Sequence, residues 1–155
     1  MKKINPEHVE KLIEAINSAP YFQLLSMRMR ELGLGYSISE VDIAQKHLNP
    51  FGGVHGGVFS SIIDSAAFWA LFYGIEDENA GLTTVDLNLN YLSPAIKGKL
   101  IAESHQIKLG KTLGYADCRV TDASGMLLAH GTLTVMTLPG KAPTIGPPFP
   151  KKFLD

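Results

Sequence analysis

The sequence has 155 residues, of which 45% are hydrophobic and 19% are charged, and its formal net charge is −1. These values are typical of one globular domain, and a net charge close to zero provides no general attraction to nucleic acid or to an acidic membrane surface. The only cysteine is Cys118, which excludes an intrachain disulfide and disfavours a cysteine-based metal site. We therefore expect a single domain over residues 1–155 in a reducing, cytoplasmic environment.

The N-terminal segment, residues 1–25, is predicted to form a covering helix. Apolar residues recur at helical spacing from Pro6 onward, and Asn5 stands at the N-cap position before that proline. Charged residues interrupt every apolar run that could serve as the core of an export signal, so we expect no signal peptide. Pro20 ends the helix, and a short helical turn leads into the first strand.

Two strands joined by a glycine turn are predicted next, over residues 27–34 and 36–44. In the second strand Val41 and Ile43 alternate with acidic residues, which is the pattern of a strand with one buried face. The stretch 47–53 is rich in asparagine, proline and glycine, and it is expected to form a turn.

A long helix is predicted over residues 55–75. This stretch is apolar almost all round the helix, as expected when other structure encloses it, and Asp64 is its only acidic residue. An ionised carboxylate inside a buried helix is costly unless it is paired, hydrogen-bonded or used in chemistry. Asp64 and the absence of basic anchors at both ends also argue against a membrane span.

Two glycines, Gly56 and Gly57, stand at the start of this helix. They leave the first backbone N–H groups uncovered, and these groups favour negative charge together with the positive end of the helix dipole. A helix that begins with exposed donors and carries Asp64 about two turns later has the two parts needed to stabilise an oxyanion and to transfer a proton.

Four further strands are predicted after a polar linker, over residues 83–92, 99–109, 112–122 and 126–138. The first of them alternates between an expected packed face and an expected polar face. The packed face comprises Val85, Leu87, Leu89 and Tyr91, and the polar face comprises Thr84, Asp86, Asn88 and Asn90. Later strands carry small residues that would let a helix lie close to the sheet, namely Gly114, Ala116, Cys118, Ala129 and Gly131.

The order of elements is one helix, two strands, a long buried helix and four strands. This order predicts an α+β fold in which an antiparallel sheet wraps around the central helix. Residues 139–155 are rich in proline, glycine and lysine and are predicted to form an irregular C-terminal tail.

Polar residues and glycines that could take part in binding or catalysis occur in a characteristic order along the chain. They are Asn49, His55-Gly56-Gly57 and Asp64, then Thr84-Val85-Asp86, and finally Gly110-Lys111-Thr112. This constellation resembles the hotdog-fold acyl-CoA thioesterases of the PaaI type, and the resemblance covers roughly residues 49–138. It implies a hotdog fold, a homodimer or dimer of dimers with joined sheets, and active sites at the subunit interface.

The resemblance implies hydrolysis of an acyl or aryl thioester of coenzyme A, which is substrate, with no separate cofactor. The Gly56 N–H would be the oxyanion donor. Asp64 would be the general base that activates water or a nucleophile that forms an anhydride. The alternative is a carboxylate that is merely hydrogen-bonded to Ser60 or Ser61 one turn earlier.

Three further residues have implied catalytic roles. Asn49 would polarise the carbonyl or hold water, although it also fits a plain turn residue before a proline. Thr84 would position water from the neighbouring subunit, although threonine is common in strands for steric reasons. His55 is expected to orient the turn rather than to act as acid or base.

Coenzyme A requires a narrow channel for its pantetheine arm and positive charge for its phosphates. The resemblance assigns the phosphate side to Lys108, Gly110, Lys111 and Thr112. It assigns the other wall of the channel to residues 91–96, among them Tyr91, Ser93 and Pro94. Gly57 and Asp86 complete the predicted coenzyme-contacting set. Single lysines are commonly only solvated, so this assignment depends on the turn that carries them.

Other chemistry is disfavoured by the sequence. The remaining histidines have no metal-ligand spacing, so no metal site is expected. The serines of the central helix lack a nucleophile elbow, and Cys118 is interpreted as a packed thiol. Two rival functions remain open, a hydroxyacyl-thioester dehydratase on the same fold and a catalytically silent acyl-CoA-binding module.

Overall fold

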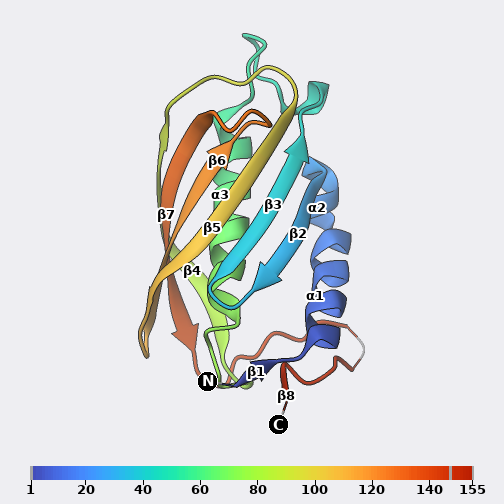
Figure 1. Ribbon diagram of the computed structural model, residues 1–155, viewed down its shortest axis with the longest axis vertical. Coiled ribbons are helices and arrows are strands. Elements are labelled where there is room, and N and C mark those ends of the chain that lie inside the picture. The colour runs from blue at the N-terminus through green and yellow to red at the C-terminus, as the bar shows by residue number, and fades with distance from the viewer. Residues whose placement is uncertain (1, 147, 155) are drawn as a thin grey trace.

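The computed structural model describes residues 2–146 and 148–154, so residues 1, 147 and 155 of the predicted domain and tail lie outside the described residues. The elements follow the predicted order, with short additions at both ends (Figure 1). The helices are α1 (Pro6–Ser18), α2 (Pro20–Leu25), the 3-10 helix η1 (Gln45–His47) and α3 (Gly56–Phe72). The strands are β1 (Lys3–Ile4), β2 (Met27–Gly33), β3 (Tyr36–Asp42), β4 (Gly81–Tyr91), β5 (Lys99–Leu109), β6 (Leu113–Thr121), β7 (Leu127–Leu138) and β8 (Phe153–Leu154).

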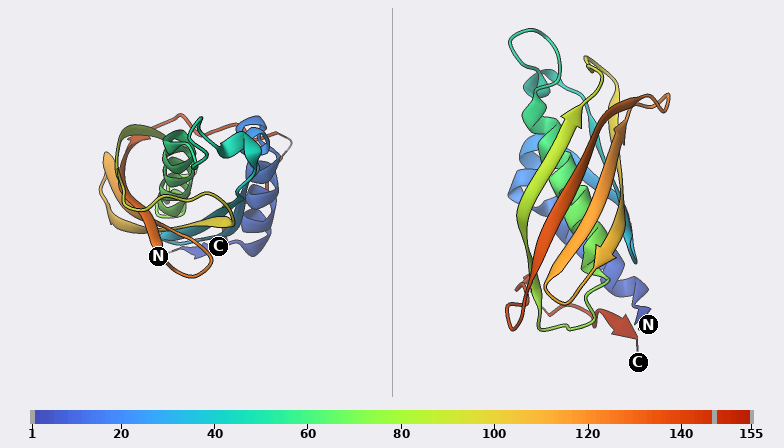
Figure 2. Two further views of the ribbon diagram at one scale, coloured as in Figure 1. Left: turned by 90° about the horizontal axis from the view of Figure 1, so that it is seen from above. Right: turned by 90° about the vertical axis from the view of Figure 1, so that its left-hand side faces the viewer.

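The larger sheet has six strands in the order β2-β3-β5-β6-β7-β4, and each neighbouring pair is antiparallel. The sheet curves around α3, and α1 lies beside the β2 edge (Figures 1 and 2). The predicted α+β fold, an antiparallel sheet wrapped around a long central helix, is therefore confirmed. Strand β4 forms one end of the sheet and pairs only with β7 among the described strands.

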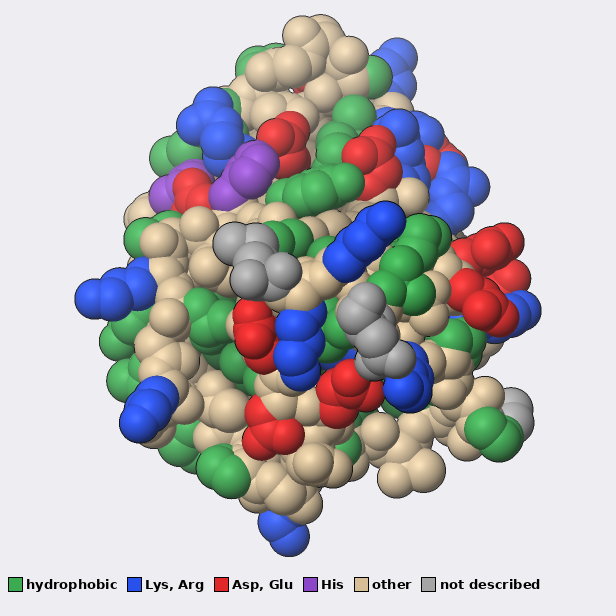
Figure 3. Space-filling view, turned by 60° about the horizontal axis from the view of Figure 1, so that its bottom comes forward, with side chains coloured by type: hydrophobic (Ala, Val, Ile, Leu, Met, Phe, Trp, Pro, Cys, Tyr) green, Lys and Arg blue, Asp and Glu red, His purple; other side chains and the backbone are tan. Residues whose placement is uncertain are grey.

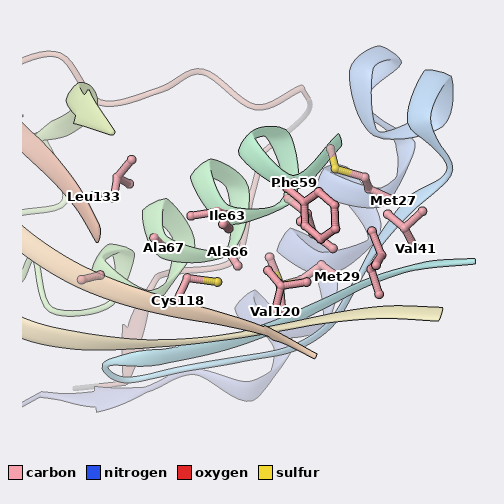
Figure 4. Packing of buried hydrophobic residues seen from close by; sticks show 14 of the residues in the cluster. Met27, Met29, Val41, Phe59, Ile63, Ala66, Ala67, Cys118, Val120 and Leu133 are labelled. Atoms are coloured by element: carbon pink, nitrogen blue, oxygen red, sulfur yellow. The ribbon is translucent and has the colours of Figure 1, made fainter. Parts of the chain in front are cut away.

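The hydrophobic core lies between α3 and the concave face of the sheet (Figure 4). Fully buried residues of α3 include Ile62, Ile63, Ala66, Ala67 and Leu71, and they face strand residues that include Cys118, Val120 and Leu133. A Cβ atom on Gly131 would lie 3.0 Å from Ile63 Cγ2 and 3.0 Å from the Asn88 carbonyl oxygen, so glycine permits the close approach of α3 to β7. Each large buried side chain contributes roughly 1.5–3 kcal/mol to stability.

Strand β4 departs from the predicted alternation at Val85. Thr84 and Asp86 pair with consecutive residues of β7, so Val85 is the extra residue of a β-bulge and is 49% exposed. Thr84 consequently turns toward α3, whereas Leu87 and Leu89 pack inward beyond the bulge. The predictions that Val85 is packed and that Thr84 shares an outer polar face with Asp86 were wrong, because one inserted residue reverses the side-chain phase.

The two chain ends pair with each other. Strand β8 (Phe153–Leu154) is antiparallel to β1 (Lys3–Ile4), so the predicted tail is not irregular throughout and the N-terminal segment is not only helical. Lys152 Nζ donates hydrogen bonds to the carbonyl oxygens of Phe72 and Ile75, both at 2.7 Å. These bonds satisfy one carbonyl group at the C-terminal end of α3 and one just beyond it. Burial lowers the pKa of Lys152 to about 8. Around this end of the molecule acidic and basic side chains are interspersed, with hydrophobic patches between them (Figure 3).

A buried carboxylate, Glu40, joins β2, β3 and β5 through charged side chains. Glu40 is 3% exposed and accepts hydrogen bonds from Arg28 and Arg30, with Lys99 Nζ at 3.1 Å. Burial alone would raise the pKa of Glu40, but the bonds from Arg28, Lys99 and Arg30 outweigh it and lower the pKa to about 2.

We predict that Glu40→Gln lowers the free energy of unfolding at pH 7 by roughly 1–3 kcal/mol, because it leaves three cations without their carboxylate. The folded-state pKa lies below the usual value of 4.5, so this stabilisation is complete above about pH 5 and is lost as the pH falls toward 2. Urea unfolding of both proteins at several pH values measures the difference. Asp42→Asn, at a 73% exposed position beside Lys99, is the control and should change stability little. If the free energies of unfolding of the wild type and of Glu40→Gln fell in parallel between pH 5 and pH 2, this prediction would be contradicted.

Candidate active site

The central feature of the site is a hydrogen bond between β4 and α3. Asp64 lies half-buried in the third turn of α3, and Thr84 Oγ1 donates to Asp64 Oδ1 at 2.9 Å. The bulge at Val85 makes this contact possible, because it turns Thr84 toward the helix. Both partners belong to one chain, so Thr84 reaches Asp64 within its own subunit and not, as expected, from a neighbouring one.

Asp64 accepts no hydrogen bond from the nearby serines Ser60 and Ser61. Ser60 Oγ and Ser61 Oγ both donate to the Gly57 carbonyl oxygen, at 3.0 and 2.8 Å, so the alternative in which Asp64 bonds one of them is wrong. Burial raises the pKa of Asp64, and the hydrogen bond from Thr84 opposes part of that rise. Within the described residues Asp64 has no cationic partner, so it is a more basic carboxylate than one on the surface.

The start of α3 presents one unused backbone donor. His55 is the N-cap with an extended backbone, and its Nδ1 accepts a hydrogen bond from the Gly57 N–H at 2.8 Å. The Gly57 donor is thereby engaged, whereas the Gly56 N–H has no acceptor among the described residues. Gly56 is therefore the free donor at the positive end of the helix dipole.

Asn49 organises the loop that precedes the helix. Its Oδ1 accepts hydrogen bonds from the N–H groups of Phe51 and Gly53, at 2.9 and 3.3 Å, which is the turn role considered from the sequence. The side-chain amide Nδ2 has no acceptor among the residues that the structure describes. Asn49 therefore shapes the loop with its oxygen and retains a donor for a ligand.

A cavity of about 440 Å³ lies beside the start of α3. Tyr91 Oη donates to the Gly56 carbonyl oxygen at 3.2 Å, and its ring packs edge-on against Phe59 with centroids 5.9 Å apart. A Cβ on Gly56 would lie 3.0 Å from Tyr91 Oη, so glycine suits this contact. The predicted channel residues Tyr91, Ser93 and Pro94 all line the cavity with Gly56. Leu92, which belongs to the predicted stretch 91–96, lines it too, and so does Val54, which was not predicted.

The predicted phosphate-contacting turn lies at the other end of α3. The hairpin between β5 and β6, which carries residues 108–112, is close to the helix C-terminus, where Leu109 packs against Gly74 (Figure 1). One chain therefore does not bring this turn together with Gly56 and Tyr91. Asp86 is exposed on the outer side of β4, beyond the bulge.

The spacing along α3 separates the candidate oxyanion donor from the candidate base. Gly56 and Asp64 are eight positions apart, and a rise of 1.5 Å per residue places them about 12 Å apart along the axis. A carbonyl held by the Gly56 N–H and a water held by Asp64 must lie within about 3 Å of each other for reaction. The Gly56 and Asp64 of one chain are thus too far apart to act on the same carbonyl.

Comparison with known proteins identifies the family. A family model described as the thioesterase superfamily matches residues 51–129, which include the Gly56 donor, Asp64 and Thr84. This chain belongs to the thioesterase superfamily. The chain is 30% identical to human acyl-coenzyme A thioesterase 13 over 132 residues, which cover 83% of this chain and 93% of that protein. It is also 30% identical to a putative esterase of Archaeoglobus fulgidus over 115 residues, covering 74% and 72%.

Solved structures of thioesterases share the fold. A Haemophilus influenzae thioesterase superposes with a TM-score of 0.80 at 21% identity, covering 90% of this chain and 96% of that one. Zebrafish thioesterase superfamily member 2 superposes with a TM-score of 0.72 at 25% identity, covering 83% and 94%. The hotdog fold implied by the sequence resemblance is confirmed for this thioesterase.

Metal sites and membrane-spanning helices are both absent from the described part of the thioesterase. No group of three or more histidine, cysteine, aspartate or glutamate side chains there is arranged to hold a metal ion. No helix there has both the length and the apolar character needed to cross a bilayer. Burial raises the pKa of the Cys118 thiol, as expected for a packed and unreactive side chain.

We predict that Thr84→Val raises the pKa of Asp64, because it removes a hydrogen bond donated to the ionised carboxylate while preserving the shape of the side chain. The measurement is a pH titration of the Asp64 carboxyl carbon by NMR. Thr84→Ser retains the hydroxyl and is the matched control, with a pKa close to that of the wild type. An unchanged or lower pKa in Thr84→Val would mean that the hydroxyl does not stabilise the ionised form.

Proposed function

We propose that this thioesterase hydrolyses an acyl or aryl thioester of coenzyme A to the free acid and coenzyme A, with Asp64 as the general base. The observation that carries the proposal is the hydrogen bond from Thr84 to a half-buried Asp64 that has no cationic partner in the described chain. Coenzyme A as part of the substrate is supported by the similarity to human acyl-coenzyme A thioesterase 13, which extends over most of both chains.

The Thr84–Asp64 pair is suited to hold a water molecule. A hydroxyl has one hydrogen, and Thr84 donates it to Asp64 Oδ1, so the lone pairs of Oγ1 and the second carboxylate oxygen remain as acceptors. A water that donates one hydrogen to each of these atoms keeps its own lone pair for attack. Asp64 then takes one proton as the oxygen–carbon bond forms.

The reaction proceeds through a tetrahedral intermediate. Its oxyanion accepts a hydrogen bond from the Gly56 N–H at the positive end of a helix, and the Asn49 amide is a second donor. When the carbon–sulfur bond breaks, the thiolate of coenzyme A leaves and takes the proton that Asp64 accepted. The carboxylic acid product carries the oxygen of the water.

Two chains are needed to complete one site. The 12 Å separation along α3 is removed when Asp64 and Thr84 of one chain meet Gly56 and Asn49 of a second chain, with the two helices antiparallel about a two-fold axis. The same arrangement places the N-terminal end of one α3 beside the C-terminal end of the other. The cavity at Tyr91 in one chain would thereby approach the partner's β5–β6 turn, so both predicted halves of the coenzyme site come together.

The exposed edge of β4 supports association of two sheets. An edge strand presents unpaired backbone groups, and β4 has no neighbour on its outer side among the described strands. Joining the β4 edges of two chains would satisfy these groups and would bury the exposed Val85. We therefore assign the chain a homodimer, which can pair further into a tetramer.

The rival functions are less well supported. A dehydratase requires a catalytic histidine, whereas Nδ1 of His55 is engaged in capping α3 and orienting Gly57. A silent binding module has no need of a half-buried carboxylate held by a hydroxyl and free of cationic partners. Hydrolysis uses both features.

We predict that Asp64→Asn lowers kcat by about 10²- to 10⁴-fold, because the amide cannot accept the proton of the attacking water. Thiol release from a panel of acyl-CoA thioesters measures the rate. In the wild type kcat/KM should rise with pH through the pKa of Asp64, and Thr84→Val should move that rise to higher pH. Equal rates for wild type and Asp64→Asn would contradict the assigned base.

A single turnover in ¹⁸O-labelled water separates the general base from the nucleophile. Direct attack of water puts the label into the acid in the first turnover. An anhydride formed by unlabelled Asp64 and opened by water at the Asp64 carbonyl carbon would pass a carboxylate oxygen of the protein to the acid instead. Unlabelled first product therefore contradicts the general base, and labelled first product excludes an anhydride that opens at Asp64.

We predict that two inactive variants restore activity together. Asn49→Asp keeps the oxygen that holds the loop but loses the amide donor, and Asp64→Asn loses the base. Co-expression should recover about a quarter of wild-type activity, since half of randomly paired dimers would carry one intact site of two. Each variant expressed alone is the control. Mixed dimers without activity would contradict a site built from two chains, as would a monomer with full turnover.

A further inference from the structure

A second, apolar cavity lies between α1, α3, β4 and the C-terminal segment. Its volume is about 320 Å³, near the lower end of the range of roughly 300–1,000 Å³ typical of small-molecule sites. Its walls include Leu12 and Ile16 of α1, Phe68 and Trp69 of α3, Leu82 of β4 and Ile145 of the tail. The described lining is otherwise alanine, glycine, proline and phenylalanine, with a single charged residue, Lys141.

Asp64 and Thr84 do not line this cavity, but two of its lining residues lie close to them along α3 and β4. Phe68 lies four residues after Asp64, so it occupies the same face of α3 one turn further on. Leu82 lies two residues before Thr84, on the same face of β4 and upstream of the bulge at Val85. The path from Asp64 to Phe68 along α3 and the path from Thr84 to Leu82 along β4 therefore both lead into this apolar cavity. Both paths lead away from the other cavity, at Gly56.

The chemistry of the walls selects for a hydrocarbon. A hydroxyl or charged group placed against these side chains would lose its water without gaining partners, which costs it binding energy. A hydrocarbon gains about fourfold in affinity for each methylene that it buries. The lining of this cavity therefore favours a hydrocarbon over a polar or charged group.

Building on the proposed function, we propose that this cavity receives the acyl or aryl group of the thioester and limits its length. Water-sized groups occupy about 30 Å³ each, so the cavity accommodates on the order of ten such groups. The substrate class is therefore an unsubstituted medium-length acyl chain or an aryl group with a short linker. Longer chains meet the wall formed by α1 and the tail.

The residues that limit the length of the acyl chain lie outside the segment of the sequence that matches the family model. Leu12, Ile16 and Ile145 come from α1 and the tail, whereas the thioesterase model covers residues 51–129. Ala15 on α1 also lines the cavity, and its small side chain leaves room that a larger one would fill. Acyl selectivity can thus vary through these outer segments while Asp64 and Gly56 stay unchanged.

A binding experiment tests the cavity without turnover. Trp69 lines the cavity and is the only tryptophan of the sequence, so its fluorescence reports occupancy. We expect S-decyl-coenzyme A, a thioether that cannot be hydrolysed, to change Trp69 emission and to bind at least tenfold more tightly than the S-ethyl analogue. Ala15→Phe should weaken binding of the decyl analogue more than tenfold and leave the ethyl analogue unchanged. In thiol-release assays the same variant should shift the preferred acyl chain to a shorter one.

The control variant is Glu14→Phe, which adds the same ring at the neighbouring exposed position of α1 outside the cavity. Circular dichroism confirms that both variants are folded. Equal affinity for ethyl and decyl analogues, or equal effects of the two variants, would overturn the assignment of the cavity. Chain-dependent binding without thiol release from any acyl-CoA would instead contradict the proposed hydrolysis and leave the cavity assignment supported.

Discussion

A carboxylate on the central helix is the constraint on which this structure depends. The sheet encloses α3 so closely that glycine is required at a point of contact, Gly131, and most of the helix surface is apolar. Asp64 lies on the side that remains half open, and a hydroxyl from β4 supplies its hydrogen bond. The enclosed position raises the pKa of Asp64, and the hydrogen bond from the Thr84 hydroxyl opposes part of that rise. The proposed activation of water by Asp64 draws on both effects.

The regular rise of the helix explains why one chain holds only part of a site. The oxyanion donor must be at a helix N-terminus, because the backbone N–H groups are free only there. The base must lie further along, where the sheet can enclose it. The resulting separation of about 12 Å is a property of the helix, and the proposed second chain, running in the opposite direction, would resolve it. The positions of Tyr91 and the β5–β6 turn at opposite ends of α3 agree with that arrangement.

The segments near the two chain ends cover parts of α3 that the sheet does not enclose. The pairing of β1 with β8 places Lys152 against carbonyl groups at the end of α3, so the tail closes the lower end of the domain. The same tail, with α1, forms the outer wall of the apolar cavity beside Asp64. Segments outside the family match therefore contribute both to the stability of α3 and to the walls of the proposed acyl cavity.

The sequence by itself determined the order of elements, the enclosed helix and most of the candidate residues. These features are local: apolar residues around a whole helix, glycines before it and a single carboxylate within it are visible in one segment. Only the tertiary structure decided which of these residues meet. Strict alternation would have turned Thr84 to solvent, and one inserted residue, Val85, turns it to Asp64. A bulge depends on the register between two strands distant in sequence, and the docking of the tail depends on the two chain ends meeting, so neither appears in a local pattern.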